Sequence, residues 1–561
     1  MKFDDAEKAA ILLRQISSVF TRETDDEVPK ISNRTESLIY NIQITVEIVY
    51  KELKRLNQYK SCGPDQLHPR LLIELADQIA LPITLLFNAT LKQGTLPKDW
   101  SRAFVSPIYK KGSKHLPENY RPISLTAILC KMMERLVRDK IVSHLCNENL
   151  LSKKQYGFIS GRSTTTQLLH YLDECTRITA NGGVMDSIYL DFAKAFDTVP
   201  HRRLLGKLEA YGIRGDLYNW IKAFLSNRTQ EVVVNGSIST PSPVISGIPQ
   251  GTVLGPVLFV IYINDLLDNI TSGGLMFADD TKIYRQITSR SDALKLQSDI
   301  NSLEEWSKIW QLHFNHDKCH VLTMGKFENI QHAHQYIVYD NEIEHVFNEK
   351  DLGVRIDSEL NFEEHIAGKV RTANAIVGQM RRSFSYLDYD TFKRIYIAFV
   401  RPHLEYGEAV WSPHLARNID ALENVQMRAT KLVDGLYNLD YSERLKRLDL
   451  PTLVYRRRRG DVIEMYKHFH TYDKCTLAPS FKPRERLSRK HRFQLHTPQT
   501  KDGTNGPQSN FFFQRTTEIW NNLPENVVEA QDVNNFKNRL DKAWKLDPLM
   551  YDHKATDTLR E

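Results

Sequence analysis

Three aspartates lie at the ends of apolar stretches that are typical of buried strands. Asp191 ends the stretch SIYLD, and Asp279 and Asp280 end the stretch GLMFADD. An unpaired buried carboxylate is costly, so we expect cations beside these residues. Carboxylate oxygens suit Mg²⁺, and two such ions about 3.5–4 Å apart can hold the attacking and leaving oxygens of a phosphoryl transfer. A lone Asp-Asp pair is more often a solvated turn, so this prediction depends on the neighbouring motifs.

The segments around these aspartates predict an α+β core. Strand patterns cover residues 103–109, 188–192, 231–236, 275–284 and 319–323, and helical spacing covers 45–56, 71–91, 126–145, 202–211, 216–225, 254–267 and 291–312. Two acidic strands with helices between them favour a sheet that is covered on one face. Beyond Glu363 the pattern is mostly helical.

Six motifs follow one another in an order that resembles reverse transcriptases of non-LTR retrotransposons, in particular the jockey-like group. They are YRPISL (120–125), QYGFISGRST (155–164), DFAKAFDTVPH (191–201), SGIPQGTVLGP (246–256), FADD (277–280) and KDLGV (350–354). The segment YGEAVWSPH (406–414) and an arginine-rich segment are also similar to that group, so the resemblance covers nearly the whole chain.

The resemblance implies a right-hand polymerase with a mainly helical, basic C-terminal region. The implied parts are an N-terminal helical extension (1–60), fingers (61–185), a palm with the catalytic core (186–345), a primer grip with the thumb (346–415) and the basic C-terminal region (416–561). Jockey-like elements generally encode an endonuclease upstream, so we expect this chain to correspond to the polymerase half of an element.

The implied activity is that of an RNA-directed DNA polymerase, which extends a primer 3′-OH with dNTPs by two-metal phosphoryl transfer. The implied cofactors are two Mg²⁺ ions, for which Mn²⁺ can substitute, and the implied partners are an RNA template and a DNA primer. The alternative is a catalytically silent, nucleic-acid-binding remnant of a mobile element. Intact aspartates favour the first interpretation, because decayed copies tend to lose such residues.

The resemblance also assigns roles around the metal ions. Asp191, Asp279 and Asp280 match the metal-binding carboxylates, and the backbone carbonyl of Phe192 is an expected further ligand. Neighbouring strand residues point to opposite faces, so we expect Asp280 to serve the site less directly. Lys318 matches the lysine that protonates the departing pyrophosphate, although a surface lysine before a strand is the alternative.

Further matches concern the nucleotide and the primer. Phe196 matches an aromatic residue that excludes a ribose 2′-OH, with a core phenylalanine as the alternative. Two residue pairs are assigned to the nucleotide and one to the primer, each with an ordinary turn or a solvated charge as its alternative. These pairs are Gln250 and Gly251 beside the incoming nucleotide, Lys110 and Arg121 on the triphosphate, and Leu352 and Gly353 in the primer grip.

Positive charge is concentrated in one part of the chain. The 561 residues carry a formal net charge of only +6, but residues 443–492 contain 15 Lys and Arg against 6 Asp and Glu, a local charge of +9. This segment includes the run Arg456, Arg457, Arg458 and Arg459. We expect two of these arginines to contact RNA and the others to pair with acids such as Asp461. A solvated helix face is the alternative, and the run also suits nuclear import.

The composition fits a folded protein rather than a disordered or fibrous one, with 41% hydrophobic and 26% charged residues. The N-terminus MKFDDAEKAA does not resemble a signal peptide, and the apolar stretch VLGPVLFVIYI is too short to span a membrane. Six scattered cysteines without a C-x-x-C pair fit a reducing compartment. The sequence therefore predicts an intracellular protein without membrane contact, and the nucleus is one candidate location.

Overall fold

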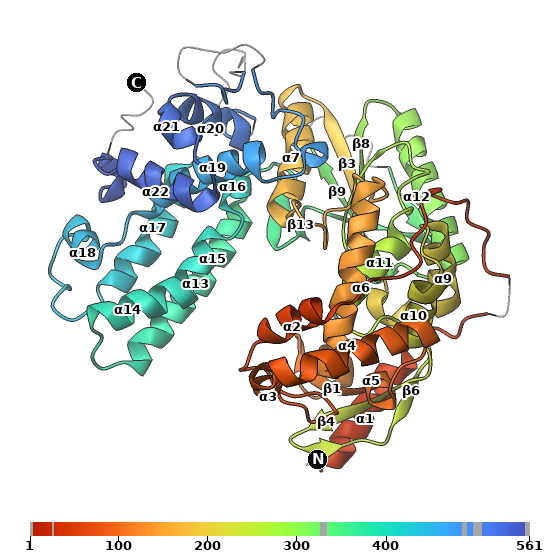
Figure 1. Ribbon diagram of the computed structural model, residues 1–561. Helices are drawn as coiled ribbons and strands as arrows, with labels where there is room; N and C mark the ends of the chain where they lie inside the picture. Colours follow the sequence, from red (N-terminus) through yellow and green to blue (C-terminus); the bar gives the residue numbers. More distant parts are fainter. Residues whose placement is uncertain (1–3, 25–26, 326–333, 485–490, 497–507, 556–561) are drawn as a thin grey trace.

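Five strands form the central sheet, whose order is β12-β9-β3-β8-β7. The computed structural model describes residues 4–24, 27–325, 334–484, 491–496 and 508–555. The strands of this sheet are β3 (Val184–Leu190), β7 (Gly273–Phe277), β8 (Asp280–Ile287), β9 (His320–Met324) and β12 (Glu344–Val346). Strand β3 lies in the middle and pairs antiparallel with both β8 and β9. The mixed α/β architecture agrees with the predicted class (Figure 1).

Helices cover both faces of the central sheet, so the prediction of one covered face is wrong. Met185 packs into the hydrophobic cluster that contains α7 (Thr164–Ala180), whereas Ile188 and Leu190 pack into the cluster on the other side. That second cluster contains α9 (His201–Ala210), α11 (Gly255–Ile263) and α12 (Arg290–Trp310). Successive strand residues point to opposite faces, and β3 is apolar on both, which is typical of a strand buried on both sides.

A second sheet lies in the lower part of Figure 1, with the order β2-β1-β4-β5 and β6 also paired to β4. Its strands are β1 (Arg102–Tyr109), β2 (Tyr120–Leu125), β4 (Arg228–Val234), β5 (Ser237–Ile238) and β6 (Ser242–Val244). Helix α1 (Asp5–Ser18) packs its apolar side on this sheet, where Leu12 and Leu13 meet Val105 and Val232. The neighbouring helices are α2 (Val46–Lys54), α3 (Pro69–Glu74), α4 (Ala76–Gln93), α5 (Lys98–Ser101), α6 (Ile128–Asn147) and α10 (Gly215–Leu225).

The last third of the chain is helical, as the sequence predicts. It follows the short pairs β10 (Ile337–Val338) with β11 (Asn341–Glu342) and β13 (Asn348–Asp351) with β14 (Val354–Asp357). Its α-helices are α13 (Glu363–Ser383), α14 (Tyr389–Ile395), α15 (Arg401–Glu405), α16 (Glu408–Trp411), α17 (Ala416–Thr430), α18 (Tyr441–Leu448), α19 (Leu453–His470), α20 (Phe512–Asn521), α21 (Glu525–Val528) and α22 (Val533–Ala543). Figure 1 shows α7 between the C-terminal helices and the central sheet.

The predicted strand over residues 275–284 is a hairpin rather than one strand. β7 ends at Phe277, β8 begins at Asp280, and these two residues pair across a two-residue turn. The other predicted elements lie within a few residues of observed ones, except that residues 71–91 divide into α3 and α4. None of the described helices has the length and apolarity that a membrane crossing requires.

Candidate active site

The three predicted carboxylates meet at one end of the central sheet. Asp191 directly follows β3, Asp279 is the second residue of the β7–β8 turn, and Asp280 begins β8. The strand register pairs Leu190 with Thr281, so the next position in the ladder places Asp191 beside Asp280. Strand pairing therefore brings together Asp191 and Asp280, which are almost ninety positions apart in the sequence.

The turn that carries Asp279 has an unusual backbone. Ala278 has a φ of +54°, and a positive φ at the first central residue of a two-residue hairpin is normally supplied by glycine. Backbone strain of this kind persists only when the surrounding structure fixes it. Here the fully buried Gln155 accepts the N–H of Ala278 on its Oε1 at 2.9 Å. A Cβ on Gly157 would collide with the backbone of Ala278, so these two segments of the chain lie very close together.

Residues 154–157 thus support the turn that carries Asp279, a contact that the sequence did not predict. The QYGF motif helped to identify the family resemblance, but no function was assigned to Gln155 or Gly157 from it. The available signal was a glutamine beside a glycine in an apolar context, which fits a buried amide that bonds a nearby backbone. The backbone of residues 154–156 also bonds Met276 on both sides, at 2.8 and 2.7 Å.

The protein environment disfavours the ionised forms of Asp279 and Asp280. Burial raises the pKa of Asp279, and the neighbouring Asp191 carboxylate adds to that rise. Asp280 reaches solvent, yet the protein around its carboxylate raises its pKa to about 7, with further contributions from Asp279 and Asp191. Like charges that share a site disfavour each other's ionised form, and a bound cation would reverse that effect.

The two FADD aspartates have different electrostatic neighbours. The cations that lower the pKa of Asp279 are Arg121 and Lys110, which come from the second sheet. Asp280 is instead influenced by Asp351 and Lys282, on the side of the β13–β14 hairpin. The less direct role of Asp280 stays a prediction, because Asp279 and Asp191 also act on its carboxylate.

The donor chemistry suits a divalent metal that arrives with its substrate. Within the described ranges, no group of three or more His, Cys, Asp or Glu side chains is arranged to hold a metal ion. Mg²⁺, however, commonly takes only one or two protein carboxylates together with substrate phosphates. The hydrogen bonds that join Asp191 and Ala193 to the 313–315 segment use the carbonyls of Asp191 and His313, and leave the Phe192 carbonyl out of the pair.

Lys318 lies at this site and contacts a predicted metal ligand directly. Its Nζ donates to Oδ1 and Oδ2 of Asp191 at 3.2 and 3.1 Å. The lysine side chain is 47% exposed and the aspartate side chain 37%, so the pair is accessible to solvent and to ligands. The sequence predicted a lysine near the leaving group but gave no reason to expect this contact.

Lys110 and Arg121 lie on the β1–β2 hairpin and face the carboxylates. Burial lowers the pKa of Lys110, and the nearby cations Arg121 and Lys318 lower it further. In the part of the chain that the structure describes, neither Lys110 nor Arg121 forms an ion pair with a carboxylate. Repelling cations without acidic partners are a suitable arrangement for a polyanionic ligand.

Phe196 is partly core and partly surface. Its ring stacks on Phe259, with centroids 4.3 Å apart, and meets the edge of Phe158 at 6.2 Å. Phe158 is itself 57% exposed, so this aromatic group reaches the surface. The stacking on Phe259 agrees with the core alternative, and the exclusion of a ribose 2′-OH stays a prediction.

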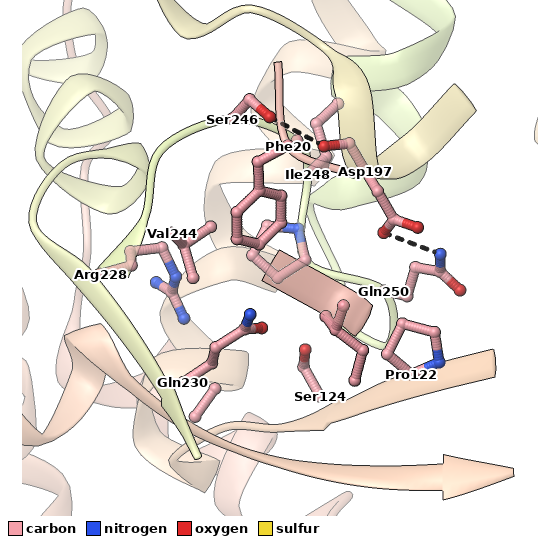
Figure 2. Close-up of a pocket in the computed structure, with 14 residues that line it drawn as sticks. Phe20, Pro122, Ser124, Asp197, Arg228, Gln230, Val244, Ser246, Ile248 and Gln250 are labelled. Atoms are coloured by element: carbon pink, nitrogen blue, oxygen red, sulfur yellow. Dashed lines mark hydrogen bonds between the residues drawn. The ribbon is translucent and has the colours of Figure 1, made fainter. Parts of the chain in front are cut away.

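The SGIPQG loop is held between α8 (Ala195–Thr198) and β2. Gln250 Nε2 donates to Asp197 Oδ1 at 3.1 Å, and Ser246 Oγ donates to the Asp197 carbonyl at 2.9 Å (Figure 2). Gly251 has a φ of +97°, and a Cβ there would lie 2.9 Å from the Ser124 carbonyl. The cavity in Figure 2 holds about 30 Å³, room for a water molecule rather than a nucleotide.

The predicted primer-grip residues Leu352 and Gly353 form the two-residue turn between β13 and β14. Leu352 has a φ of +45°, and its carbonyl accepts the Tyr406 hydroxyl at 2.8 Å. On the other side, Asp351 forms a buried ion pair with Lys282 of β8. The hairpin is thus fixed to the strand that begins with the second FADD aspartate.

The arginine run contacts other parts of the protein, which favours a structural role, and the expected contact of two of its members with RNA stays a prediction. All four residues lie in α19, and burial lowers the pKa of Arg457, which is surrounded by acids. The remaining three form ion pairs with distant residues: Arg456 with Glu405, Arg458 with Asp547 and Arg459 with Asp541. Asp461 pairs with Arg515 instead. Residues 485–490 of the basic segment lie outside the described residues.

Comparisons with known proteins agree with this site. The family model described as "Reverse transcriptase (RNA-dependent DNA polymerase)" matches residues 108–386. The chain is 29% identical over 406 residues to the RNA-directed DNA polymerase from mobile element jockey of Drosophila funebris, covering 70% of this chain and 44% of that protein. It is 27% identical over 465 residues to the probable RNA-directed DNA polymerase from transposon BS of Drosophila melanogaster, covering 80% and 49%.

A third relative is the probable RNA-directed DNA polymerase from transposon X-element of Drosophila melanogaster, with 28% identity over 399 residues, 69% of this chain and 43% of that protein. The chain thus spans less than half the length of these curated relatives. The predicted resemblance to jockey-like non-LTR retrotransposon reverse transcriptases is confirmed, and residues 108–386 match the model of the reverse transcriptase (RNA-dependent DNA polymerase) family.

Proposed function

We propose that this chain is an RNA-directed DNA polymerase that extends a DNA primer 3′-OH with dNTPs on an RNA template. The observation that carries the proposal is the sheet end where Asp191, Asp279 and Asp280 lie together, because the pKa values of Asp279 and Asp280 are raised and neither forms an ion pair within the described residues. The names of the relatives support the same activity. Because the chain spans less than half of those relatives, the activity of any longer protein is part of the proposal.

The proposed architecture is a right hand. The palm (186–345) contains the central sheet with α9, α11 and α12, and 346–415 contains the primer grip and the thumb. The fingers (61–185) contribute β1 and β2 to the second sheet, whose other strands β4, β5 and β6 come from the palm range. Residues 1–60 are an N-terminal extension and 416–561 a separate helical region. Lys110 and Arg121 of the β1–β2 hairpin, which form no ion pair within the described residues, then face the palm carboxylates, as a triphosphate site requires.

Asp191 and Asp279 would hold two Mg²⁺ ions, or Mn²⁺ in their place, with Asp280 and the Phe192 carbonyl as accessory ligands. Bound there, the ions supply acidity to the primer 3′-OH and stabilise charge on the leaving pyrophosphate. The protein's own groups orient the substrates. Lys110 and Arg121 bind the triphosphate as a point charge and a bidentate donor, respectively.

Three other groups complete the proposed site. Lys318, which contacts Asp191, donates a proton to the pyrophosphate oxygen once the substrate displaces it from the carboxylate. Phe196 presents its exposed edge to the sugar C2′ and excludes a hydroxyl there. Gln250 and Gly251 place the SGIPQG loop beside the base pair, and Leu352 and Gly353 hold the primer end.

Primer extension tests the proposal directly. Purified protein, Mg²⁺ and dTTP should extend oligo(dT) on poly(rA), while the Asp191→Asn protein should not. A matched reaction without divalent metal, and one with rTTP in place of dTTP, test the metal and sugar assignments. Absence of extension by a folded parent protein with either Mg²⁺ or Mn²⁺ would refute the proposal.

A second candidate is the catalytically silent nucleic-acid-binding remnant. One observation favours it: Lys318 forms an ion pair with Asp191, which is a proposed metal ligand. A remnant would bind a primer–template duplex but show no Mg²⁺-dependent extension and no Mg²⁺-dependent gain in dNTP affinity. Measuring duplex binding and extension on the same preparation separates the two candidates.

A further inference from the structure

We propose that the C-terminal helical region positions the FADD turn, acting through an ion pair between Asp473 and Arg162. The connection runs through residues 152–164, which we call the brace loop. Asp473 lies beyond residues 108–386, so the reverse transcriptase domain receives this support from outside its own matched segment. The inference rests on the proposed function, because it assigns the brace a role in primer extension.

Residues of the C-terminal region form hydrogen bonds with the brace loop at several points. Arg162 Nη2 and Nε donate to Asp473 Oδ2 at 2.8 and 3.1 Å. The backbone N–H of Asp473 donates to the Gly161 carbonyl at 3.0 Å. Farther along the loop, the Tyr156 hydroxyl donates to the Thr476 carbonyl at 2.8 Å. Side-chain and backbone contacts thus fix this loop against residues 473–476.

The same arginine organises the interior of the brace loop. Arg162 Nη1 donates to the carbonyls of Ser152 and Gln155, at 2.6 and 2.5 Å. Its side chain is only 5% exposed, whereas Asp473 is 32% exposed, so the aspartate is the carboxylate that balances a nearly buried guanidinium. Removal of Asp473 would leave that charge uncompensated and release the loop.

The brace loop in turn holds the strained turn. Gln155 Oε1 accepts the N–H groups of Gly157 and Ala278, at 2.7 and 2.9 Å. Ala278 has a positive φ and precedes the metal-binding Asp279, so its conformation must be imposed by its neighbours. A continuous set of contacts therefore joins Asp473 to the turn through Arg162 and Gln155.

The C-terminal region also has an independent anchor, which makes it a stable support. Ser480 N–H donates to Asp173 Oδ2 of α7 at 2.8 Å, and α16 packs on α7 as well. Helix α7 covers one face of the central sheet. Supporting groups of this kind matter because a displacement of about 1 Å can cost about 10²-fold in rate.

The test compares Asp473→Ala with Asp541→Ala, which removes an exposed acid from another Asp–Arg pair in the same region. Hydrogen exchange is measured on the peptide that contains Ala278. We expect this peptide to exchange about 10-fold faster in Asp473→Ala and at the parent rate in Asp541→Ala. Asp473→Glu, which keeps the charge, should restore most of the protection.

Single-turnover primer extension gives the functional readout. Asp473→Ala should lower the maximal rate about 10-fold, leave primer–template affinity within about twofold and raise the Mg²⁺ concentration at half-maximal rate. If Asp473→Ala does not fold, Tyr156→Phe removes the hydroxyl that bonds the Thr476 carbonyl and His170 Nδ1, and should change exchange in the same direction. Parent-like exchange at the turn in a folded Asp473→Ala or Tyr156→Phe protein would overturn the proposal. Exchange decides this even if the parent does not extend primers, which would refute the proposed function alone.

Discussion

Two regions of this molecule contain many charged side chains, and they differ in how many of these side chains form ion pairs within the chain. In α19 three of the four arginines form ion pairs with acids from the chain itself, with Arg458 and Asp547 only 7% and 2% exposed. At the end of the central sheet, Asp279 and Asp280 have raised pKa values, and the nearby Lys110 has a lowered one. Within the described residues none of these three sheet-end side chains forms an ion pair, so they are available to a charged ligand.

The comparison shows how a charged motif can be interpreted. A buried charge is tolerated when it is paired, and breaking such a pair is strongly destabilising. An unbalanced cluster costs stability in the free protein and is retained where a ligand compensates it. Charge that is balanced within the chain therefore indicates structure, whereas charge that is left unbalanced indicates a binding site.

The largest expected effect follows from loss of a central carboxylate. Asp191→Asn removes a proposed metal ligand and also the partner of Lys318. Because loss of outer-sphere partners alone costs about 10–100-fold in metal sites, we expect primer extension to fall by more than about 10²-fold. Steady-state extension at saturating Mg²⁺ measures the effect, and circular dichroism controls for folding. A folded Asp191→Asn protein with parent-like activity would contradict the metal assignment.

Loss of Lys318 should have the next largest effect. Lys318→Ala should slow the chemical step by about 10²–10⁴-fold if the lysine acts as a general acid. Single-turnover extension measures that step, and duplex binding should be unchanged. Lys318→Arg is the matched control, because it keeps the charge beside Asp191 but holds its proton too tightly to donate it. An unchanged single-turnover rate in Lys318→Ala removes the proposed role.

Metal binding should depend on pH through Asp280. Its pKa of about 7 means that the metal-free protein holds a proton there that a metal ion must displace. Apparent Mg²⁺ affinity should rise by up to about tenfold per pH unit below 7 and level off above it. Asp280→Asn should flatten this dependence. Calorimetric titrations in buffers of different ionisation enthalpy would also detect the released proton.

The same shift predicts a stability trend of defined sign. A carboxyl whose pKa is higher in the folded state than the ordinary 3.8 binds its proton more tightly when folded. Between about pH 4 and 7 this group therefore makes the metal-free protein less stable as pH rises. Mg²⁺ should oppose the loss. Denaturant titrations of the parent and Asp280→Asn at pH 5 and pH 7 isolate the contribution of this group.

In the arginine run we expect an effect on stability and none on catalysis. Arg458→Met leaves Asp547 buried without its charged partner, which should cost about 3–5 kcal/mol of unfolding free energy. The salt dependence of RNA binding should stay at the parent slope, because these residues face acids rather than phosphates. A reduced slope with unchanged stability would reverse the interpretation of this region.

The sequence predicted the local features well and the long-range ones less well. DFAKAFDTVPH and FADD predicted aspartates at strand ends, because apolar runs that end in aspartate are a local pattern. The partners of the arginine run, such as Glu405 and Asp547, lie about 50 and 90 residues away, and no local pattern links them. The contact between Lys318 and Asp191 was missed for the same reason.

Burial on both sides of β3 was missed for a related reason. The covering helix α7 precedes β3, whereas α9 and α11 follow it and lie between the two acidic strands in the sequence, and α12 follows the second of these strands. The support from Gln155 depends on a side-chain amide that meets a backbone about 120 residues away. Such contacts come from the tertiary fold, which periodicity and propensity do not specify.

One measurement tests the central claim most directly: single-turnover primer extension on poly(rA), titrated with Mg²⁺, for Asp279→Asn and Asp541→Asn. Both variants replace one aspartate by its amide, one at the unbalanced sheet end and one in the balanced α19 pair. We predict that Asp279→Asn folds but does not extend the primer, while Asp541→Asn extends it at the parent rate. Parent-like extension by Asp279→Asn, or a comparable loss in both variants, would contradict this account.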